Sequence, residues 1–164
     1  MVRKAPEPGE RYRGVEGHLG YLLRQAQHAF ATTMEQRLRD SGLTRPQFGV
    51  LSVLVADPGL SAADLARAAL VTPQAINLLV TALEREGLVR RKKHPTHGRV
   101  LQLFATSKGA QRVRAAYPTV IELEDRIADG LSERELSAIK RWLVDVATSM
   151  QERSEGAHRS TARR

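Results

Sequence analysis

Apolar residues recur at helical spacing along most of the chain, and the breaks between these runs delimit the predicted elements. The first helix follows a polar tail, residues 1–17, and ends near Ser41 and Gly42. Its apolar positions are Leu19, Leu22, Leu23, Ala26, Phe30, Met34 and Leu38. A second helix begins at Thr44, where Gln47 completes a capping box, and it ends before Asp57-Pro58-Gly59. Residues that disfavour helix therefore mark the end of each of these two helices, and a capping box marks the start of the second.

The middle of the chain predicts two short helices and a hairpin. Ser61 caps a helix that carries Leu65 and Ala66, and Thr72 with Pro73 opens another after only a few residues. Two short helices joined so tightly indicate a helix-turn-helix. After Gly87 the pattern changes to two extended segments, 88–92 and 99–104, around a connection that contains Pro and Gly. This arrangement predicts a β-hairpin.

Two more helices complete the pattern. Thr106 opens a long helix that ends at Gly130, and Ser132 with Glu135 forms a second capping box. The last helix is lined by Leu136, Ile139, Leu143, Val146 and Met150, and residues 152–164 form a basic tail. The predicted fold is mainly α with a small β-hairpin wing: a winged helix-turn-helix at 44–105, flanked by long helices at 18–43 and 106–151. The apolar faces of the flanking helices predict burial against a second copy around a two-fold axis.

On a helical wheel, residues 73–86 separate into two faces. Ile76, Leu79, Val80 and Leu83 share the face that packs on the preceding helices. Gln74, Asn77, Thr81 and Arg85 share the other, with Leu78 among them. Gln and Asn pair bidentately with adenine in the DNA major groove, and an apolar side chain contacts the thymine methyl. The alternative is an ordinary solvated helix face.

The hairpin strengthens the DNA hypothesis. It carries five basic residues and no acidic one between 89 and 105, namely Arg90, Arg91, Lys92, Lys93 and Arg99. Basic side chains neutralise phosphates, and an Arg at a wing tip suits the negative potential of a narrow minor groove. The competing interpretation is a charged edge that protects the hairpin from aggregation.

Composition agrees with a polyanionic partner. Lys and Arg total 26 against 18 Asp and Glu, a net charge of +8. The chain has no Cys, no secretory signal, and no apolar stretch long enough for a membrane span, which predicts a soluble cytoplasmic protein. Among five His only one pair is close in sequence, and phosphate-loop, nucleophile-elbow and zinc-protease motifs are all missing. We therefore predict no metal, no cofactor and no enzymatic activity.

Several motifs together resemble the MarR family of bacterial transcription regulators over about residues 18–151. They are Ser61-Ala62-Ala63-Asp64-Leu65-Ala66, Val71-Thr72-Pro73-Gln74-Ala75, Leu83-Glu84-Arg85-Glu86-Gly87-Leu88-Val89-Arg90-Arg91, His94-Pro95-Thr96-His97-Gly98-Arg99 and Thr106-Ser107-Lys108-Gly109. The resemblance implies a homodimer that binds a palindromic site in double-stranded DNA, usually to repress transcription. It also implies release by a small phenolic or anionic effector, bound between the dimerisation and DNA-binding parts.

The resemblance assigns roles to particular residues. The recognition helix would use Thr72, Pro73, Gln74, Asn77, Leu78, Thr81 and Arg85. The wing and the backbone contacts would come from Arg45, Ser61, Arg91, Lys92, Lys93, His97 and Arg99. Tyr21, Arg24, His28, Phe48 and Tyr117 would supply stacking faces and an anion partner for an effector, although each also suits plain core or dimer packing.

The wing departs from the family pattern at one informative place. His97 stands where the family usually has Asp, two residues before the wing Arg99. Protonation of its imidazole, with an ordinary pKa of about 6.5, would add positive charge beside phosphate and tighten DNA binding at mild acidity. A solvated loop histidine without such a role is the alternative.

Two further functional hypotheses remain open at this point. The first is a weakly specific architectural DNA-binding protein. The second is a helical adaptor for protein interactions, in which the basic hairpin is only a surface. Binding to random and selected DNA across a salt titration separates these hypotheses from a sequence-specific regulator.

Overall fold

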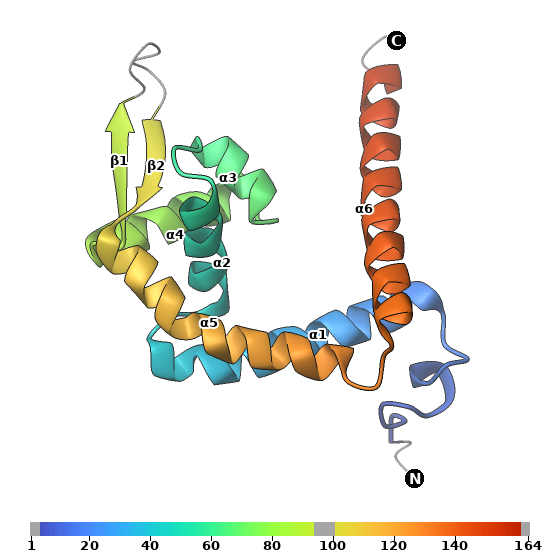
Figure 1. Cartoon of the computed structure of the whole chain (residues 1–164). Coiled ribbons are helices and arrows are strands. Elements are labelled where there is room, and N and C mark those ends of the chain that lie inside the picture. The colour runs from blue at the N-terminus through green and yellow to red at the C-terminus, as the bar shows by residue number, and fades with distance from the viewer. Residues whose placement is uncertain (1–3, 94–100, 162–164) are drawn as a thin grey trace. The chain divides into compact units, whose positions relative to one another are not determined.

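The computed structural model describes residues 4–93 and 101–161, and only the backbone of residues 151–161. The helices are α1 (Leu19–Leu38), α2 (Arg45–Ala56), α3 (Ala62–Ala68), α4 (Pro73–Arg85), α5 (Ser107–Ala128) and α6 (Glu133–Thr161), with short 3-10 turns η1 (Arg11–Arg13) and η2 (Arg39–Ser41). Strands β1 (Val89–Lys93) and β2 (Leu101–Ala105) pair antiparallel (Figure 1). The predicted mainly α fold with a small hairpin wing is confirmed.

The predicted caps lie at the starts of the helices. Thr44 and Gln47 form a reciprocal capping box on α2: the hydroxyl of Thr44 accepts from the backbone N–H of Gln47, and the Gln47 amide oxygen accepts from that of Thr44. Ser132 and Glu135 make the same pair of bonds before α6. Each cap satisfies N–H groups that the first turn of a helix leaves without partners. Local chemistry thus sets where these helices begin.

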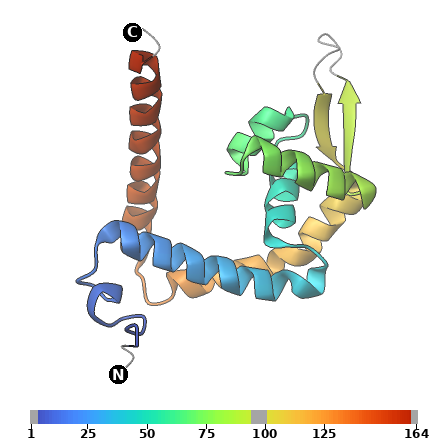
Figure 2. The same ribbon diagram turned by 180° about the vertical axis from the view of Figure 1, so that it is seen from behind.

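The chain divides into two compact units, residues 1–123 and 124–164. The core of the first unit is apolar throughout; its fully buried side chains are Leu38, Val50, Leu51, Leu54, Leu65, Ile76, Val80, Leu83, Leu88 and Leu103. They come from α1 to α4, from the hairpin and from the turns between them. In this unit α1 and α5 run in opposite directions, and α5 approaches α1 after its first turns, which lie next to the hairpin (Figure 2). An ion pair of 2.8 Å between Arg37 and Glu122 bridges them.

The second unit is essentially one helix. Up to residue 150, α6 has no buried side chain, and its apolar residues Ile139, Trp142, Leu143 and Met150 are exposed. The helix continues to Thr161, into the segment that the sequence assigns to a tail. Residues 152–161 contain no proline, so nothing in this segment sterically blocks the continuation of the helix.

No single helix among the described residues is long and apolar enough to cross a membrane. Helices α3 and α4 reach the necessary length and apolar content only when taken together, and the chain bends by 106° between them.

Candidate nucleic-acid interface

Helices α3 and α4 are joined by a tight turn that holds them at a steep angle. The backbone N–H of Leu70 donates to the carbonyl of Arg67, and that of Val71 donates to the carbonyl of Ala66. This pair of bonds is the Schellman arrangement that ends a helix with a left-handed residue. Leu70 is that residue, with φ +54°, and its side chain is 85% exposed. The turn of the helix-turn-helix therefore holds a leucine in a conformation that favours glycine.

The exposed face of α4 carries the predicted recognition residues. Ile76, Val80 and Leu83 are buried in the core. The opposite side presents Gln74, Asn77, Leu78, Thr81 and Arg85, all exposed. Leu78 is 75% exposed, which is unusual for an apolar side chain in the middle of a helix. The polar members of this set, Gln74, Asn77, Thr81 and Arg85, are named here the polar edge of α4.

A shallow apolar hollow of about 400 Å³ adjoins the polar edge. Its walls are Pro46 at the start of α2, Val71, and Ala75, Leu78, Leu79 and Ala82 of α4. At 100° per residue, Ala75, Leu79 and Ala82 lie on one side of Leu78, and the polar edge lies on the other. The side formed by Ala75, Leu78, Leu79 and Ala82 is named here the apolar edge. Leu78 is the residue at which the two edges meet.

The hairpin has two chemically different faces because side chains alternate along a strand. Arg90 pairs with Phe104 across the strands, and the cationic ends of Arg90 and Lys92 both lie 5.6 Å from the ring of Phe104. Arg91 lies on the other face, where its Nε donates to Glu84 of α4 at 2.9 Å. Arg90 and Lys92 thus form an exposed cationic face, whereas the charge of Arg91 is already paired.

The base of the hairpin is anchored to the start of α5. The hydroxyl of Thr106 donates to the backbone carbonyls of Gly87 and Leu88 and accepts from the N–H of Gly109. The ammonium group of Lys108 donates to the carbonyl of Glu86 at 2.8 Å. Since Glu86 follows α4 directly, these bonds fix the hairpin relative to α4.

Two of the predicted DNA-binding residues, Thr72 of the recognition set and Ser61 of the backbone set, also cap helices. The hydroxyl of Thr72 accepts from the N–H of Ala75 at 3.1 Å, and that of Ser61 accepts from the N–H of Asp64 at 3.2 Å. Ser61 in turn donates to the carboxylate of Asp64, which, with help from the nearby charge of Arg67, lowers the pKa of Asp64. Capping alone explains why Thr and Ser stand at these two positions.

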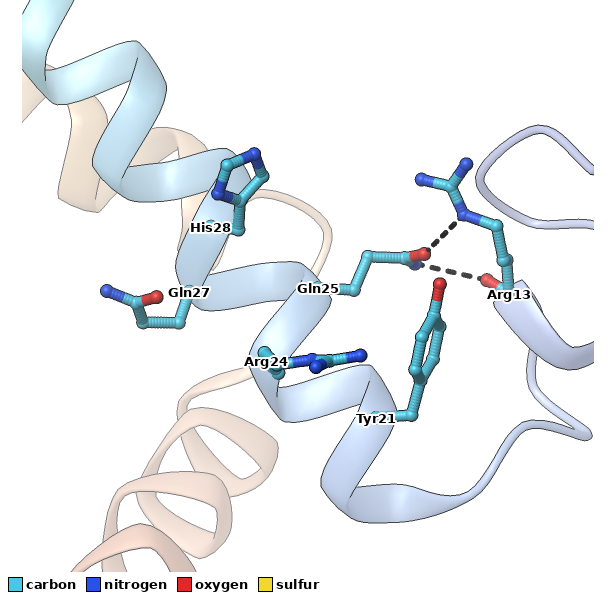
Figure 3. Close-up of a pocket in the computed structure, with 6 residues that line it drawn as sticks. All are labelled: Arg13, Tyr21, Arg24, Gln25, Gln27 and His28. Carbon is cyan, nitrogen blue, oxygen red and sulfur yellow. Dashed lines mark hydrogen bonds between the residues drawn. The ribbon is translucent and has the colours of Figure 1, made fainter. Parts of the chain in front are cut away.

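A second hollow, of about 300 Å³, lies along the N-terminal half of α1 (Figure 3). It is lined by Arg13, Tyr21, Arg24, Gln25, Gln27 and His28. The guanidinium of Arg24 lies 5.3 Å from the centre of the Tyr21 ring. Arg13 and Gln25 exchange two hydrogen bonds, from Arg13 Nε to Gln25 Oε1 at 2.8 Å and from Gln25 Nε2 to the Arg13 carbonyl at 3.1 Å. This hollow combines an aromatic face with two cations.

The same contacts change the picture of the N-terminal segment, which the sequence assigns to a flexible tail over residues 1–17. Arg13 also donates to the carbonyl of Pro6 at 2.9 Å, and the ring of Tyr12 packs edge-on against that of Tyr21. The described part of the segment is therefore attached to α1. In the described residues no group of three His, Asp or Glu side chains is placed to hold a metal ion.

Comparison with known proteins decides the family. Residues 41–100 match the MarR family. An HTH-type transcriptional repressor of Mycobacterium tuberculosis is 36% identical over 125 residues, which cover 76% of this chain and 90% of the relative. The chain belongs to the MarR family. The resemblance inferred from the sequence motifs is thereby confirmed.

Solved structures of MarR-type regulators superpose closely. The transcriptional repressor CouR bound to a 23-mer DNA duplex matches with a TM-score of 0.75 and 27% identity, over 84% of this chain and 98% of that one. The MepR–DNA complex of S. aureus matches with a TM-score of 0.73 and 28% identity, over 80% of this chain and 98% of that one. The MarR-family fold is thus shared over most of the chain.

The residues expected to form an effector cleft are not all brought together in this MarR-family chain. Tyr21, Arg24 and His28 line the hollow on α1. Phe48 is only 6% exposed and packs in the core, which is the alternative that the sequence left open for it. Tyr117 lies on α5, does not line the hollow, and is 52% exposed.

Other residues at the interface are visible only in three dimensions. Pro46 and Val71, which complete the apolar hollow, and Glu84, which neutralises Arg91, lie on different elements from their partners. Helical spacing relates positions within one helix, so it cannot pair residues across elements. The wing residues His94, His97 and Arg99 lie outside the described residues.

Proposed function

We propose that this DNA-binding MarR-family regulator is a repressor that binds a palindromic operator as a homodimer. One observation carries the proposal: the polar edge of α4 is exposed directly beside a hairpin with a cationic face. A helix fits the major groove of B-DNA, and a basic hairpin next to it can meet the phosphates that border the groove. The DNA complexes of CouR and MepR support this geometry.

The proposed contacts divide into base contacts and phosphate contacts. Gln74 and Asn77 present amides, which hydrogen-bond to adenine N6 and N7, and Arg85 presents the fork that suits guanine. Thr81 has its hydroxyl hydrogen directed at the carbonyl of Asn77, so its oxygen remains an acceptor toward a base. The phosphate contacts are assigned to Arg45, Arg90, Lys92 and Lys93, with Arg99 at the minor groove. Arg91 contributes less because it is already paired with Glu84.

The homodimer is supported by unpartnered apolar side chains. Within its own unit, α6 leaves Ile139, Trp142 and Leu143 between 37% and 45% exposed. A second copy related by a two-fold axis would bury this stripe against itself. Two identical recognition helices then contact two half-sites, so a two-fold symmetric operator is expected.

The hollow on α1 is the candidate effector site. Its cations, Arg13 and Arg24, and its aromatic ring, Tyr21, suit a small phenolic or anionic compound. A compound that binds the DNA-free conformation more tightly than the DNA-bound one would weaken operator binding. The factor by which affinity for the operator falls is set by the ratio of the compound's affinities for the two conformations. A screen of such compounds tests this site: an effector bound there should release DNA from the parent protein but not from Arg24→Ala.

The decisive experiment is selection of bound sites from random duplex DNA. An inverted repeat is expected. Asn77→Ala should then lose on the order of 1–3 kcal/mol of discrimination at its own base, whereas Lys93→Ala should weaken selected and random DNA alike and reduce the salt slope by about one unit. Lys4→Ala, which removes the same charge far from the hairpin in sequence, is the matched control and should change neither.

The other outcomes identify the alternatives. Equal binding to selected and random DNA would indicate an architectural protein, and the absence of binding at low salt would indicate a protein-interaction adaptor. If Asn77→Ala kept full discrimination, α4 would not be the recognition helix.

A further inference from the structure

The exposed side of α4 has a polar edge and an apolar edge. Hydrogen bonds from the Gln74, Asn77 and Arg85 side chains to bases would explain the polar edge but not the apolar one. Leu78 is 75% exposed, and Ala75, Leu79 and Ala82 beside it are only half-buried. Together with Pro46 they border a hollow with almost no polar surface. A solvated helix face would carry polar residues at these positions. The apolar edge is therefore suited to contact an apolar group on a binding partner.

The surroundings of the apolar edge restrict what that group belongs to. Leu78 lies between the polar edge and the hollow, so a duplex laid along the polar edge brings its base edges next to Leu78. Arg45 is exposed at the start of α2 next to Pro46, and the hairpin adds Arg90, Lys92 and Lys93. Charge complementarity therefore favours a polyanion that also carries small apolar groups.

Double-stranded DNA fits this description in one specific way. In the major groove, every base edge presents hydrogen-bonding atoms, and the only apolar group is the 5-methyl of thymine. Resting on the proposed function, we propose that the apolar edge of α4 reads thymine: Leu78 packs on a thymine methyl, and the hollow beside it receives a second methyl from a neighbouring base pair. The operator half-site therefore contains thymines that are read by shape and apolar contact, next to the bases read by the polar edge.

Replacing thymine with uracil tests this directly, because uracil keeps the base pairing and removes only the methyl. The probe is the duplex obtained by site selection, resynthesised with single uracil substitutions at each thymine. One or two positions in each half-site should lose affinity on the order of fourfold, the value of one buried methyl. The slope of affinity against salt should not change, since no phosphate contact is altered.

Substitution of Leu78 assigns the effect to this residue. In Leu78→Ala, uracil should cost less than twofold at the position whose methyl packs on Leu78, because that methyl no longer has its partner, whereas the position whose methyl enters the hollow should keep most of its effect. Since Leu78 is exposed, this variant keeps the core intact. Val55→Ala is the matched control: Val55 is an exposed apolar residue of α2, at 42%, and does not line the hollow. It should retain the full fourfold uracil effect.

Each remaining outcome overturns a defined statement. If uracil has no effect at any position of a specifically bound operator, the thymine assignment is wrong while the proposed function stands. If the effect persists undiminished in Leu78→Ala, another residue reads the methyl. If selection yields no preferred sequence at all, the proposed function fails and this inference fails with it.

Discussion

The contact between Gly109 and Leu88 allows a sharp prediction about how the wing is held. A Cβ on Gly109 would lie 2.2 Å from the backbone oxygen of Leu88 and 3.1 Å from its carbonyl carbon. That oxygen also accepts a hydrogen bond from the N–H of Thr106 at 2.9 Å. Leu88 is fully buried, and its own N–H donates to the carbonyl of Leu83 at 2.8 Å. The backbone of Leu88 therefore cannot move away from Gly109 without breaking one of these two hydrogen bonds.

The expected cost of Gly109→Ala follows from this geometry. Overpacking of a well-ordered interior costs about 1–3 kcal/mol, and here the obstacle is backbone held on both sides, so we expect about 3 kcal/mol. The better helix propensity of Ala offsets at most about 1 kcal/mol. For a chain of this size, a net loss of about 2–3 kcal/mol lowers the Tm by roughly 4–12 °C.

The control is Gly49→Ala in α2, a helical glycine with nothing within 4 Å of the added carbon. There the substitution removes only the flexibility of glycine and should stabilise by about 0.5–1 kcal/mol. The assay is thermal unfolding at one fixed protein concentration, since the proposed dimerisation would make the Tm depend on concentration. A Gly109→Ala protein as stable as the parent would refute the reasoning. A folded but weakened variant should also lose DNA affinity, because Leu88 leads directly into β1.

Three further predictions concern the same unit. Leu70→Gly should raise stability by about 1 kcal/mol in urea unfolding, because it removes the cost of the left-handed backbone; unchanged or lower stability would contradict the strain. The hydroxyl of Ser61 lowers the pKa of Asp64 below its ordinary 3.8, so Asp64 contributes stability that is present above this pH and is lost as the pH falls through the lowered pKa. Asp64→Asn should therefore be less stable than the parent at neutral pH and should lose less on acidification, and parallel pH curves for the two proteins would argue against the cap. Protonated His97 should tighten DNA binding as the pH falls through about 6.5, and an identical pH profile for His97→Ala would exclude this role.

The starts of four helices were predictable because their determinants are local. Thr44, Ser61, Thr72 and Ser132 each cap the helix that follows, using an N–H three residues away. Such a bond needs no information from the rest of the chain. The buried face of α4 was predictable for the same reason, since Ile76, Val80 and Leu83 recur at the helical period. Leu79 also packs against the core, as the wheel predicts, but it is only partly buried because it lies at the edge of the hollow.

The features that were not predictable depend on pairs of residues far apart in sequence. Gln25 holds Arg13 by two hydrogen bonds, and this contact attaches a segment whose composition is typical of a flexible tail. The left-handed φ of Leu70 follows from the angle that the core demands between α3 and α4, not from any preference of leucine. Tertiary packing overrides local propensity at such positions.

The division of α4 into two edges also bears on how salt affects recognition. The phosphate contacts proposed for Lys92 and Lys93 would weaken as salt rises, and they would act on any DNA sequence. A contact between Leu78 and a thymine methyl is apolar, so salt does not screen it. Raising the salt concentration should therefore reduce non-specific binding more steeply than it reduces the difference between the operator and random DNA. The preference of this protein for its operator over random DNA should therefore persist at salt concentrations where the hairpin no longer binds random DNA.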